Sequence, residues 1–169
     1  MIAYELLSIV KAKAAEHGID PAFVAAFVEV ETGGRTFATR FEPAYRYVAD
    51  AARWAALTGT SEATETTGQM TSWGPMQVMG GVARELGFKG LLPELSQPEV
   101  GIEYGLCQLK RLASNYDLLP AAGAAWTFSE PLAAAYNAGS PRTGVDGDWI
   151  NAGYVQRVKT AFEGFQGKL

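Results

Sequence analysis

The spacing of apolar residues along this chain predicts a protein built mainly from α-helices. In most segments the apolar side chains recur three or four residues apart, which places them on one face of a helix. The predicted helices cover residues 2–16, 21–31, 43–57, 75–87, 97–115, 129–139 and 149–165. No segment alternates between apolar and polar residues as a half-buried strand does, and no internal repeat is present. The pattern therefore predicts one mainly α domain over residues 1–169, with little or no β-structure.

The remaining stretches are predicted to be loops, and several helix ends carry local signals. Residues 58–72 are rich in Thr, Ser and Gly and predict an exposed loop, and residues 116–128 predict irregular structure. Gly18 favours a helix end, whereas Asp20 followed by proline favours a helix start with Asp20 as the N-cap.

One carboxylate of the predicted helix 21–31 falls on its apolar face. At about 100° per residue, Glu31 lies between Phe27 and Val24, whereas Glu29 lies on the opposite, polar face. Glu31 also stands at the C-terminal end of the helix, where the helix dipole disfavours a negative charge. Both effects favour the protonated carboxylic acid, which is the form that a general acid needs. Alternatively, the last helical turn is partly exposed and the Glu31 side chain simply reaches water.

The composition narrows the chemistry that is open to this chain. Its 169 residues carry a formal charge of −4 and a pI near 5.0, which argues against nucleic acid as the main partner. A single cysteine, Cys107, excludes an intrachain disulfide and a cysteine-rich zinc site. A single histidine, His17, excludes a multi-histidine metal cluster and argues against a Ser-His-Asp triad. With no metal or cofactor motif in the sequence, acid–base chemistry is expected to rest on carboxylates, tyrosines or lysines.

Three short motifs follow one another along the chain. They read Val28-Glu29-Val30-Glu31-Thr32-Gly33-Gly34, then Ser72-Trp73-Gly74-Pro75-Met76-Gln77-Val78-Met79, then Leu132-Ala133-Ala134-Ala135-Tyr136-Asn137-Ala138-Gly139. In this order they resemble the motifs of soluble lytic transglycosylases, which are relatives of goose-type lysozyme. In that family a helix ends in Glu-Ser, a loop reads Gly-Leu-Met-Gln, and a later helix ends in Ala-Tyr-Asn-Ala-Gly. The similarity extends weakly to residues 97–99 and 154–158, and therefore covers most of the chain.

The resemblance implies a lysozyme-like fold with a catalytic cleft. It also implies cleavage of the β-1,4 bond between N-acetylmuramic acid and N-acetylglucosamine in bacterial peptidoglycan, with Glu31 as the catalytic acid and later the base. In the family the acetamido group of the muramic acid residue attacks its own anomeric carbon. The carboxylate then deprotonates the 6-hydroxyl, which closes a 1,6-anhydro ring. Such substrate-assisted chemistry can proceed with one carboxylate, and no cofactor is expected.

The resemblance implies further roles for residues in the first and third motifs. Tyr136 matches a tyrosine whose hydroxyl lies near the catalytic carboxyl and the acetamido group, although a core aromatic also fits its position. Asn137 matches an amide that binds saccharide or stem peptide, although a helix C-cap also fits. Thr32 replaces the usual serine, and its hydroxyl can orient the neighbouring helix end.

The middle motif implies a loop that binds substrate. Met76 and Gln77 match residues that line the cleft and contact sugar, and core packing is the alternative for Met76. Trp73 adjoins this turn and is the best candidate among the tryptophans to stack on a sugar, with a place in the core as its alternative.

An insertion over residues 35–72 departs from the family pattern. It carries Arg-Phe-Glu-Pro at residues 40–43, which looks like a motif of phage-associated members. Because proline extends the backbone of the residue before it, Glu42 can aim its side chain into the cleft and position a water there. Alternatively, Glu42 forms a structural ion pair with Arg40 or Arg46.

Two other functions stay open at this point. A hydrolytic muramidase that uses Glu31 and Glu42 would cleave the same bond with water, and a catalytically inactive module would bind glycan without turnover. The N-terminus lacks the basic start and apolar run of a signal peptide, and no apolar run is long enough to span a membrane. We therefore expect a monomer that is made in the bacterial cytoplasm and acts on the cell wall, as a phage endolysin or a virion-associated lysin.

Overall fold

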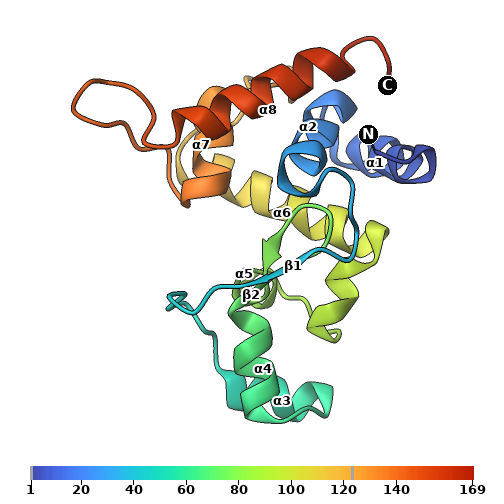
Figure 1. The fold of residues 1–169 in the computed structure, drawn as a ribbon, viewed down its shortest axis with the longest axis vertical. Coiled ribbons are helices and arrows are strands. Elements are labelled where there is room, and N and C mark those ends of the chain that lie inside the picture. Colours follow the sequence, from blue (N-terminus) through green and yellow to red (C-terminus); the bar gives the residue numbers. More distant parts are fainter. Residues whose placement is uncertain (1, 123) are drawn as a thin grey trace. The chain divides into compact units, whose positions relative to one another are not determined.

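A computed structural model describes residues 2–122 and 124–169 and shows a mainly α-helical protein (Figure 1). The chain divides into two compact units. The first comprises residues 2–34 and 106–169, and the second comprises residues 35–105. The boundary near residue 105 falls inside one long helix, α6, which runs over Pro98–Asn115.

The first unit is a bundle of helices around a central helix, most of which is buried. Besides the end of α6, it contains α1 (Tyr4–His17), α2 (Pro21–Thr32), α7 (Glu130–Ala138) and α8 (Ala152–Phe165). Helix α2 packs against α1 and α8, and α7 packs against α8. Residues 22–28 of α2 are all buried, which is the expected position of a helix that is apolar on every side.

Local signals place the ends of these helices where the sequence predicts them. The Asp20 carboxylate accepts a hydrogen bond of 2.9 Å from the backbone N–H of Ala22 and so caps α2. Gly18 and Gly33 end α1 and α2 in the left-handed conformation, with φ of 68° and 62°, which glycine adopts without steric cost. The predicted helices at 2–16, 21–31, 97–115 and 129–139 are therefore confirmed to within a few residues.

An aromatic cluster fills the core of the first unit. The Phe23 ring lies 5.0 Å from that of Phe27, 5.8 Å from Phe128 and 6.2 Å from Phe162, measured between ring centroids. These distances are those of tilted and edge-on aromatic pairs, which add to the free energy of apolar burial. The cluster joins α2 to α8 and so sets where the two helices lie against each other.

The second unit combines short helices with a small sheet. Its elements are β1 (Thr39–Phe41), α3 (Ala51–Thr58), α4 (Glu62–Gln69), β2 (Thr71–Trp73), β3 (Val78–Met79), α5 (Gly80–Glu85) and the 3-10 helix η1 (Leu92–Ser96). The three strands are antiparallel in the order β1-β2-β3, with Arg40 opposite Ser72 and Trp73 opposite Val78. Strands of two or three residues are too short to show alternation, which is why the sequence pattern missed them.

Helix boundaries in the second unit differ from the predicted ones. The helix predicted over 43–57 begins only at Ala51, because the Asp50 carboxylate caps it by accepting from the N–H of Arg53 at 3.2 Å. The loop predicted over 58–72 is wrong, since α4 and β2 lie there. The helix predicted over 75–87 is confirmed only for α5, because a turn and β3 precede it.

Helix α4 forms in a Thr-rich sequence because its buried side chains have partners. Ser61 caps it by accepting from the N–H of Thr64 at 3.1 Å. Gln69 is fully buried, and its amide both donates to the Ala49 carbonyl at 2.8 Å and accepts from the Ala49 N–H at 2.6 Å. Glu65 is also buried, and its carboxylate meets a buried arginine. Tertiary contacts therefore override a weak local preference for a helix.

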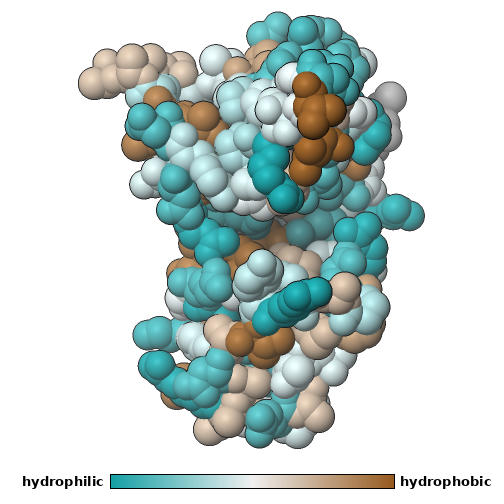
Figure 2. All heavy atoms as spheres, turned by 90° about the vertical axis from the view of Figure 1, so that its left-hand side faces the viewer, coloured by the Kyte–Doolittle hydropathy of each residue, from teal (hydrophilic) through white to brown (hydrophobic). Residues whose placement is uncertain are grey.

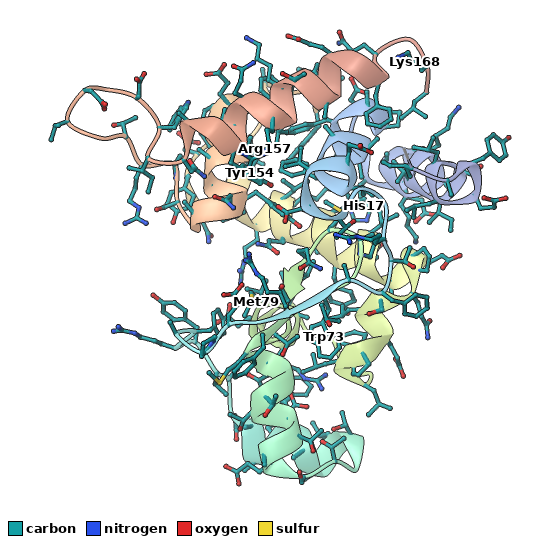
Figure 3. The ribbon with its side chains drawn as sticks, viewed as in Figure 1. His17, Trp73, Met79, Tyr154, Arg157 and Lys168 are labelled. Atoms are coloured by element: carbon teal, nitrogen blue, oxygen red, sulfur yellow. The ribbon has the colours of Figure 1, made fainter. Side chains whose placement is uncertain are left out.

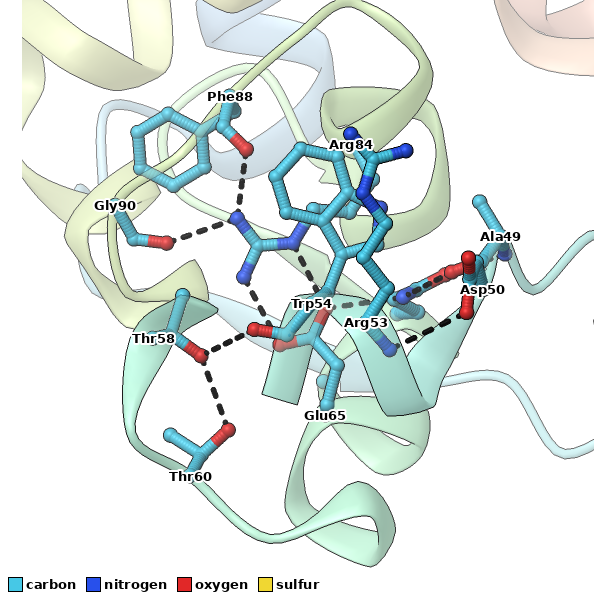
Figure 4. A network of polar contacts seen from close by, with 12 residues as sticks. Ala49, Asp50, Arg53, Trp54, Thr58, Thr60, Glu65, Arg84, Phe88 and Gly90 are labelled. Atoms are coloured by element: carbon cyan, nitrogen blue, oxygen red, sulfur yellow. Dashed lines mark hydrogen bonds and ion pairs between the residues drawn. The ribbon is translucent and has the colours of Figure 1, made fainter. Parts of the chain in front are cut away.

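The buried arginine is Arg84, which holds several segments of the second unit together (Figure 4). Its Nε and Nη2 donate to the two carboxylate oxygens of Glu65 at 2.8 and 2.9 Å. Its Nη1 donates to the carbonyls of Phe88 at 2.7 Å and Gly90 at 2.9 Å. The guanidinium also lies 4.7 Å from the centre of the Trp54 ring. Burial alone would raise the pKa of Glu65, but the hydrogen bonds from Arg84 and Gln69 outweigh it and hold that pKa below its ordinary value.

The surface visible in Figure 2 is mostly hydrophilic, and its hydrophobic residues form several separate small patches. Among residues 2–122 and 124–169, no helix combines the length and the hydropathy needed to cross a bilayer.

Glu65→Gln is expected to lower the free energy of unfolding by about 3–5 kcal/mol, because it leaves the Arg84 guanidinium buried without an anion. Urea unfolding followed by circular dichroism measures this loss. Glu62→Gln is the matched control, because Glu62 lies exposed on the same helix. This substitution should change the free energy of unfolding by no more than about 0.5 kcal/mol. Equal effects of the two substitutions would contradict this role of Glu65.

The same ion pair makes the free energy of unfolding depend on pH in acidic solution. Because the pKa of Glu65 is lowered by folding, its stabilising contribution is fully present above the ordinary value of 4.5. It is lost as the pH falls through the lower pKa of the folded state. The unfolding free energy of the wild type should therefore fall more steeply in this range than that of Glu65→Gln.

Candidate functional site

The most unusual polar contact of the first unit joins Glu31 to Tyr154. Glu31 lies in the last turn of α2 and is half-buried, as its position on the apolar face predicts. Tyr154 lies in the first turns of α8, is 6% exposed, and donates its phenolic hydroxyl to Oε1 of Glu31 at 2.5 Å. A half-buried carboxylate is thus oriented by a hydrogen bond from the neighbouring helix.

A second phenol, that of Tyr136, lies close to the same carboxylate. Tyr136 stands near the end of α7, is 7% exposed, and packs its ring 4.6 Å from the ring of Phe27. Burial first and the charge of Glu31 second raise the pKa of Tyr136 well above its ordinary value. The tyrosine that the third motif singles out therefore lies within the electrostatic influence of the carboxylate that the first motif singles out.

The pKa of Tyr154 is also raised well above its ordinary value. Burial is the largest cause, followed by the charge of Glu31 and the hydrogen bond to it. The nearby Tyr136 adds to the rise, and the positive charge of Arg157 opposes it. Both phenols consequently stay protonated in neutral and acidic solution, so that Tyr154 remains a hydrogen-bond donor to the carboxylate there.

Arg157 extends the cluster along α8. Its guanidinium lies 5.7 Å from the centre of the Tyr154 ring, and both side chains project from the same end of the helix (Figure 3). Such cation–π contacts restrain the arginine side chain while leaving its N–H donors available.

Two predicted site residues lie at the ends of the neighbouring helices. Thr32 is buried and donates its hydroxyl to the Val28 carbonyl at 3.2 Å, within its own helix. Asn137 is exposed, and its Oδ1 accepts a hydrogen bond of 3.0 Å from the Asn151 amide. The same amide donates to the Ala134 carbonyl at 3.1 Å, so Asn151 ties the end of α7 to the start of α8.

The other predicted site residues belong to the second unit. Gln77 closes the turn between β2 and β3, with φ of 49°, a conformation that is uncommon outside glycine. Its amide donates to the carbonyls of Ala38 and Gly74 at 2.9 and 3.0 Å and accepts from the Ser72 hydroxyl at 2.9 Å. Every hydrogen-bonding atom of this side chain is thus engaged in holding the turn.

Met76 and Trp73 flank this turn and are placed differently. The Met76 side chain is fully buried and packs against Gly105, where an added Cβ would lie only 2.3 Å from its sulfur. Trp73 donates its indole N–H to the Gly68 carbonyl at 2.8 Å. It lines a cavity of about 440 Å³ together with threonines of α4 and with Leu92.

Glu42 forms an ion pair with the Nε of Arg40, on the strand β1 that immediately precedes it. Its backbone N–H donates to the Met70 carbonyl at 2.8 Å, which continues the pairing of β1 with the chain before β2. Glu42 therefore has the structural ion-pair partner that was the alternative to a place in the cleft.

Tyr154 is the site residue to which the sequence analysis assigned no role. It begins the apolar face of the last helix, which continues with Val155, Val158 and Phe162. A buried tyrosine needs a hydrogen-bond partner for its hydroxyl, and Glu31 is a carboxylate on an apolar face. These two requirements together could have paired Tyr154 with Glu31 from the sequence.

This arrangement suits proton transfer. One half-buried carboxyl group is held by a donor that stays protonated, and a second phenol stands beside it. Among the described residues, no three His, Cys, Asp or Glu side chains lie where they could hold a metal ion.

Comparisons with protein-family models, with curated protein sequences and with solved structures found no match to this chain. The function must therefore be inferred from these residues and their geometry.

Tyr154→Phe should make the stability of the protein less sensitive to alkali. Because folding raises the pKa of Tyr154, its contribution is fully present below the unfolded pKa of about 10. Above that pH the unfolded state releases a proton that the folded state keeps, which lowers the unfolding free energy by about 1.4 kcal/mol per pH unit. Urea unfolding between about pH 9 and pH 11 measures the difference between wild type and variant.

The control for this titration is Tyr4→Phe. Tyr4 is 80% exposed and lies outside the site, so its substitution should leave the slope unchanged. If Tyr154→Phe keeps the slope of the wild type, the Tyr154 hydroxyl is not buried as described.

Proposed function

We propose that this chain is a peptidoglycan lytic transglycosylase and that Glu31 is its general acid and then its general base. The observation that carries the proposal is the hydrogen bond from Tyr154 to the half-buried Glu31 carboxyl group, with Tyr136 beside it. The order of the three sequence motifs supports the same assignment. Glu31, Tyr136 and Tyr154 all belong to the first unit. Single substitutions in that unit therefore test the proposal.

In the first step Glu31 acts as an acid. The carboxylic acid gives its proton to the glycosidic oxygen, and the bond between that oxygen and the anomeric carbon of N-acetylmuramic acid breaks. The acetamido oxygen of the same sugar attacks the anomeric carbon and forms an oxazolinium ion. The products of this step are the released N-acetylglucosamine end, the oxazolinium and the Glu31 carboxylate.

In the second step the Glu31 carboxylate acts as a base. It removes the proton from the 6-hydroxyl of the muramic acid, and the oxygen of that hydroxyl attacks the anomeric carbon. The bond to the acetamido oxygen breaks, and the acetamide is restored in a 1,6-anhydro sugar. Glu31 is protonated again, and no water is consumed.

The two phenols would assist these steps without exchanging protons themselves. Tyr154 holds the carboxyl group in one orientation and, as a neutral donor, stabilises the carboxylate formed after the first step. Tyr136 is proposed to accept a hydrogen bond from the acetamido N–H with its hydroxyl oxygen, which orients the acetamido oxygen for its attack. Raised pKa values suit both roles, because each phenol keeps its proton.

The remaining motif residues are proposed to contact substrate or to shape the site. Asn137 is exposed on α7 and presents an amide to saccharide or stem peptide. Thr32 is proposed to steady the helix end that carries Glu31. In the second unit, the Trp73 ring is proposed to stack on a sugar unit, whereas Met76 is fully buried and packs in the core, and Gln77 holds its own turn.

Glu31→Gln is expected to lower the rate of muropeptide release at least about hundredfold, because glutamine neither gives nor accepts the proton. The measurement is mass spectrometry of the products released from purified peptidoglycan. Glu163→Gln serves as the control, because Glu163 is exposed on α8 and its substitution should leave the rate unchanged. Circular dichroism checks that both variants fold.

The products decide between the reactions. Muropeptides that end in 1,6-anhydromuramic acid, one water lighter than reducing ends, support the transglycosylase. Reducing ends would instead indicate a hydrolytic muramidase, and Glu42→Gln would then test whether Glu42 positions the water. Glycan binding without any turnover would indicate a binding module, and an unchanged rate in Glu31→Gln would remove Glu31 from the chemistry.

Tyr154→Phe is expected to lower kcat about ten- to hundredfold with little change in KM, because it removes the group that orients the catalytic carboxyl. Steady-state release from soluble glycan strands measures both constants, and Tyr4→Phe is again the control. A loss confined to KM would show that Tyr154 acts in binding and does not position Glu31.

A further inference from the structure

An open pocket of about 410 Å³ lies between α2 and α8 on the first unit. The residues that line it are Glu29, Val30, Gln156, Arg157, Thr160 and Ala161. None of them was assigned a function by the sequence motifs. The pocket adjoins the proposed active site, because Arg157 lies over the ring of Tyr154 and Tyr154 binds Glu31.

The pocket carries one negative and one positive group. Oε2 of Glu29 is buried, and no donor among the described residues forms a hydrogen bond to it. The Arg157 side chain is exposed, and within the described part of the chain neither residue forms an ion pair. A buried carboxylate oxygen without a donor is costly, and a ligand that supplies an N–H would remove that cost.

The rest of the lining is polar on one side and apolar on the other. Gln156 donates to the Thr160 hydroxyl oxygen at 3.3 Å, which leaves the amide oxygen and the hydroxyl proton to face a ligand. Val30 and Ala161 supply small apolar surfaces. The pocket therefore suits an aliphatic chain that ends in both an ammonium and a carboxylate.

We propose that this pocket binds the zwitterionic end of an amino acid, with the ammonium on Glu29 and the carboxylate on Arg157. The assignment of the natural ligand rests on the proposed function. In peptidoglycan such an end occurs on stem peptides whose third residue is a diamino dicarboxylic acid. A stem peptide with lysine at this place offers the ammonium alone, and so fits only half of the pocket.

The geometry allows one substrate to reach both places. Glu29 and Glu31 lie two residues apart on α2, about 200° around the helix, so they face different sides of it. Half the circumference of a helix of about 10 Å diameter is about 16 Å. Three extended residues exceed this length once the lactyl group, the γ-linkage of the glutamate and the side chain of the diamino acid are added. A stem peptide on the sugar bound at Glu31 is therefore long enough to bring its third residue to the pocket.

Binding of soluble tripeptides to the whole chain, measured by calorimetry without catalysis, tests the proposal. The probes are N-acetyl-Ala-γ-D-Glu-diaminopimelate and N-acetyl-Ala-γ-D-Glu-Lys, each blocked as an amide at the α-carboxyl group of its third residue, so that the two differ only at the end of that residue's side chain. The diaminopimelate peptide should bind at least about tenfold more tightly, because only it completes the charge-assisted hydrogen bonds to Arg157. Equal affinities for the two peptides would overturn the proposal.

Two substitutions assign the two charges. Arg157→Gln should abolish the preference for diaminopimelate, and Glu29→Gln should weaken both peptides about tenfold or more, because both carry the ammonium. Lys159→Gln removes a charge from the same helix outside the pocket and should change neither affinity. Unchanged binding in Glu29→Gln or Arg157→Gln would overturn the site.

The failure of this site and the failure of the proposed function give different results. Cleavage of glycan strands that have been stripped of their peptides requires Glu31. It does not require Glu29 or Arg157, because such strands carry nothing that the pocket could bind. If the stripped strands are cleaved to 1,6-anhydro ends and the peptides bind alike, the pocket assignment is wrong and the transglycosylase stands. If the diaminopimelate peptide binds selectively but no glycan is cleaved, the zwitterion site stands and the transglycosylase does not.

Discussion

The hydrogen bond between Tyr154 and Glu31 is the contact on which the proposed chemistry of this protein depends. A carboxyl group at the end of an apolar helix loses much of its hydration, and it is tolerated there only when a donor replaces water. Tyr154 supplies that donor from α8, and the aromatic cluster around Phe23 keeps α8 packed on α2. The geometry of the site therefore depends on the packing of the core, because a change that shifts α8 also moves the Tyr154 hydroxyl away from the carboxylate.

Glu65 is a fully buried carboxylate, and a comparison with it explains why Glu31 is the one proposed as the general acid and base. Glu65 faces the guanidinium of Arg84 through two hydrogen bonds and takes a third from Gln69. This charge is fully compensated, the pKa is held low, and the group stabilises the second unit as an anion. Glu31 accepts its hydrogen bond from the neutral phenol of Tyr154, and its charge raises the pKa of a second phenol, that of Tyr136. A carboxyl group in such surroundings can lose and regain a proton, as general acid–base chemistry requires.

Helix α2 carries two carboxylates that lie in different surroundings. Glu31 turns toward the phenols of α7 and α8, and Glu29 turns toward the pocket that Arg157 completes. Arg157 connects them, because the same side chain lies over the Tyr154 ring and lines the pocket. If the proposed function holds, one pair of packed helices would provide both the proton donor for the glycan and the recognition of its peptide.

The sequence by itself determined the helices whose ends are marked by local chemistry. Asp20, Gly18 and Gly33 act on their nearest neighbours, so the boundaries of α1 and α2 follow from residue type alone. The place of Glu31 on an apolar face was also readable, because helical periodicity is a local property. The tertiary structure alone decided the small sheet, helix α4 and the role of Tyr154. Each of these depends on a partner distant in sequence, as with Tyr154 and Glu31, which are 123 residues apart, and no local pattern encodes such a partner.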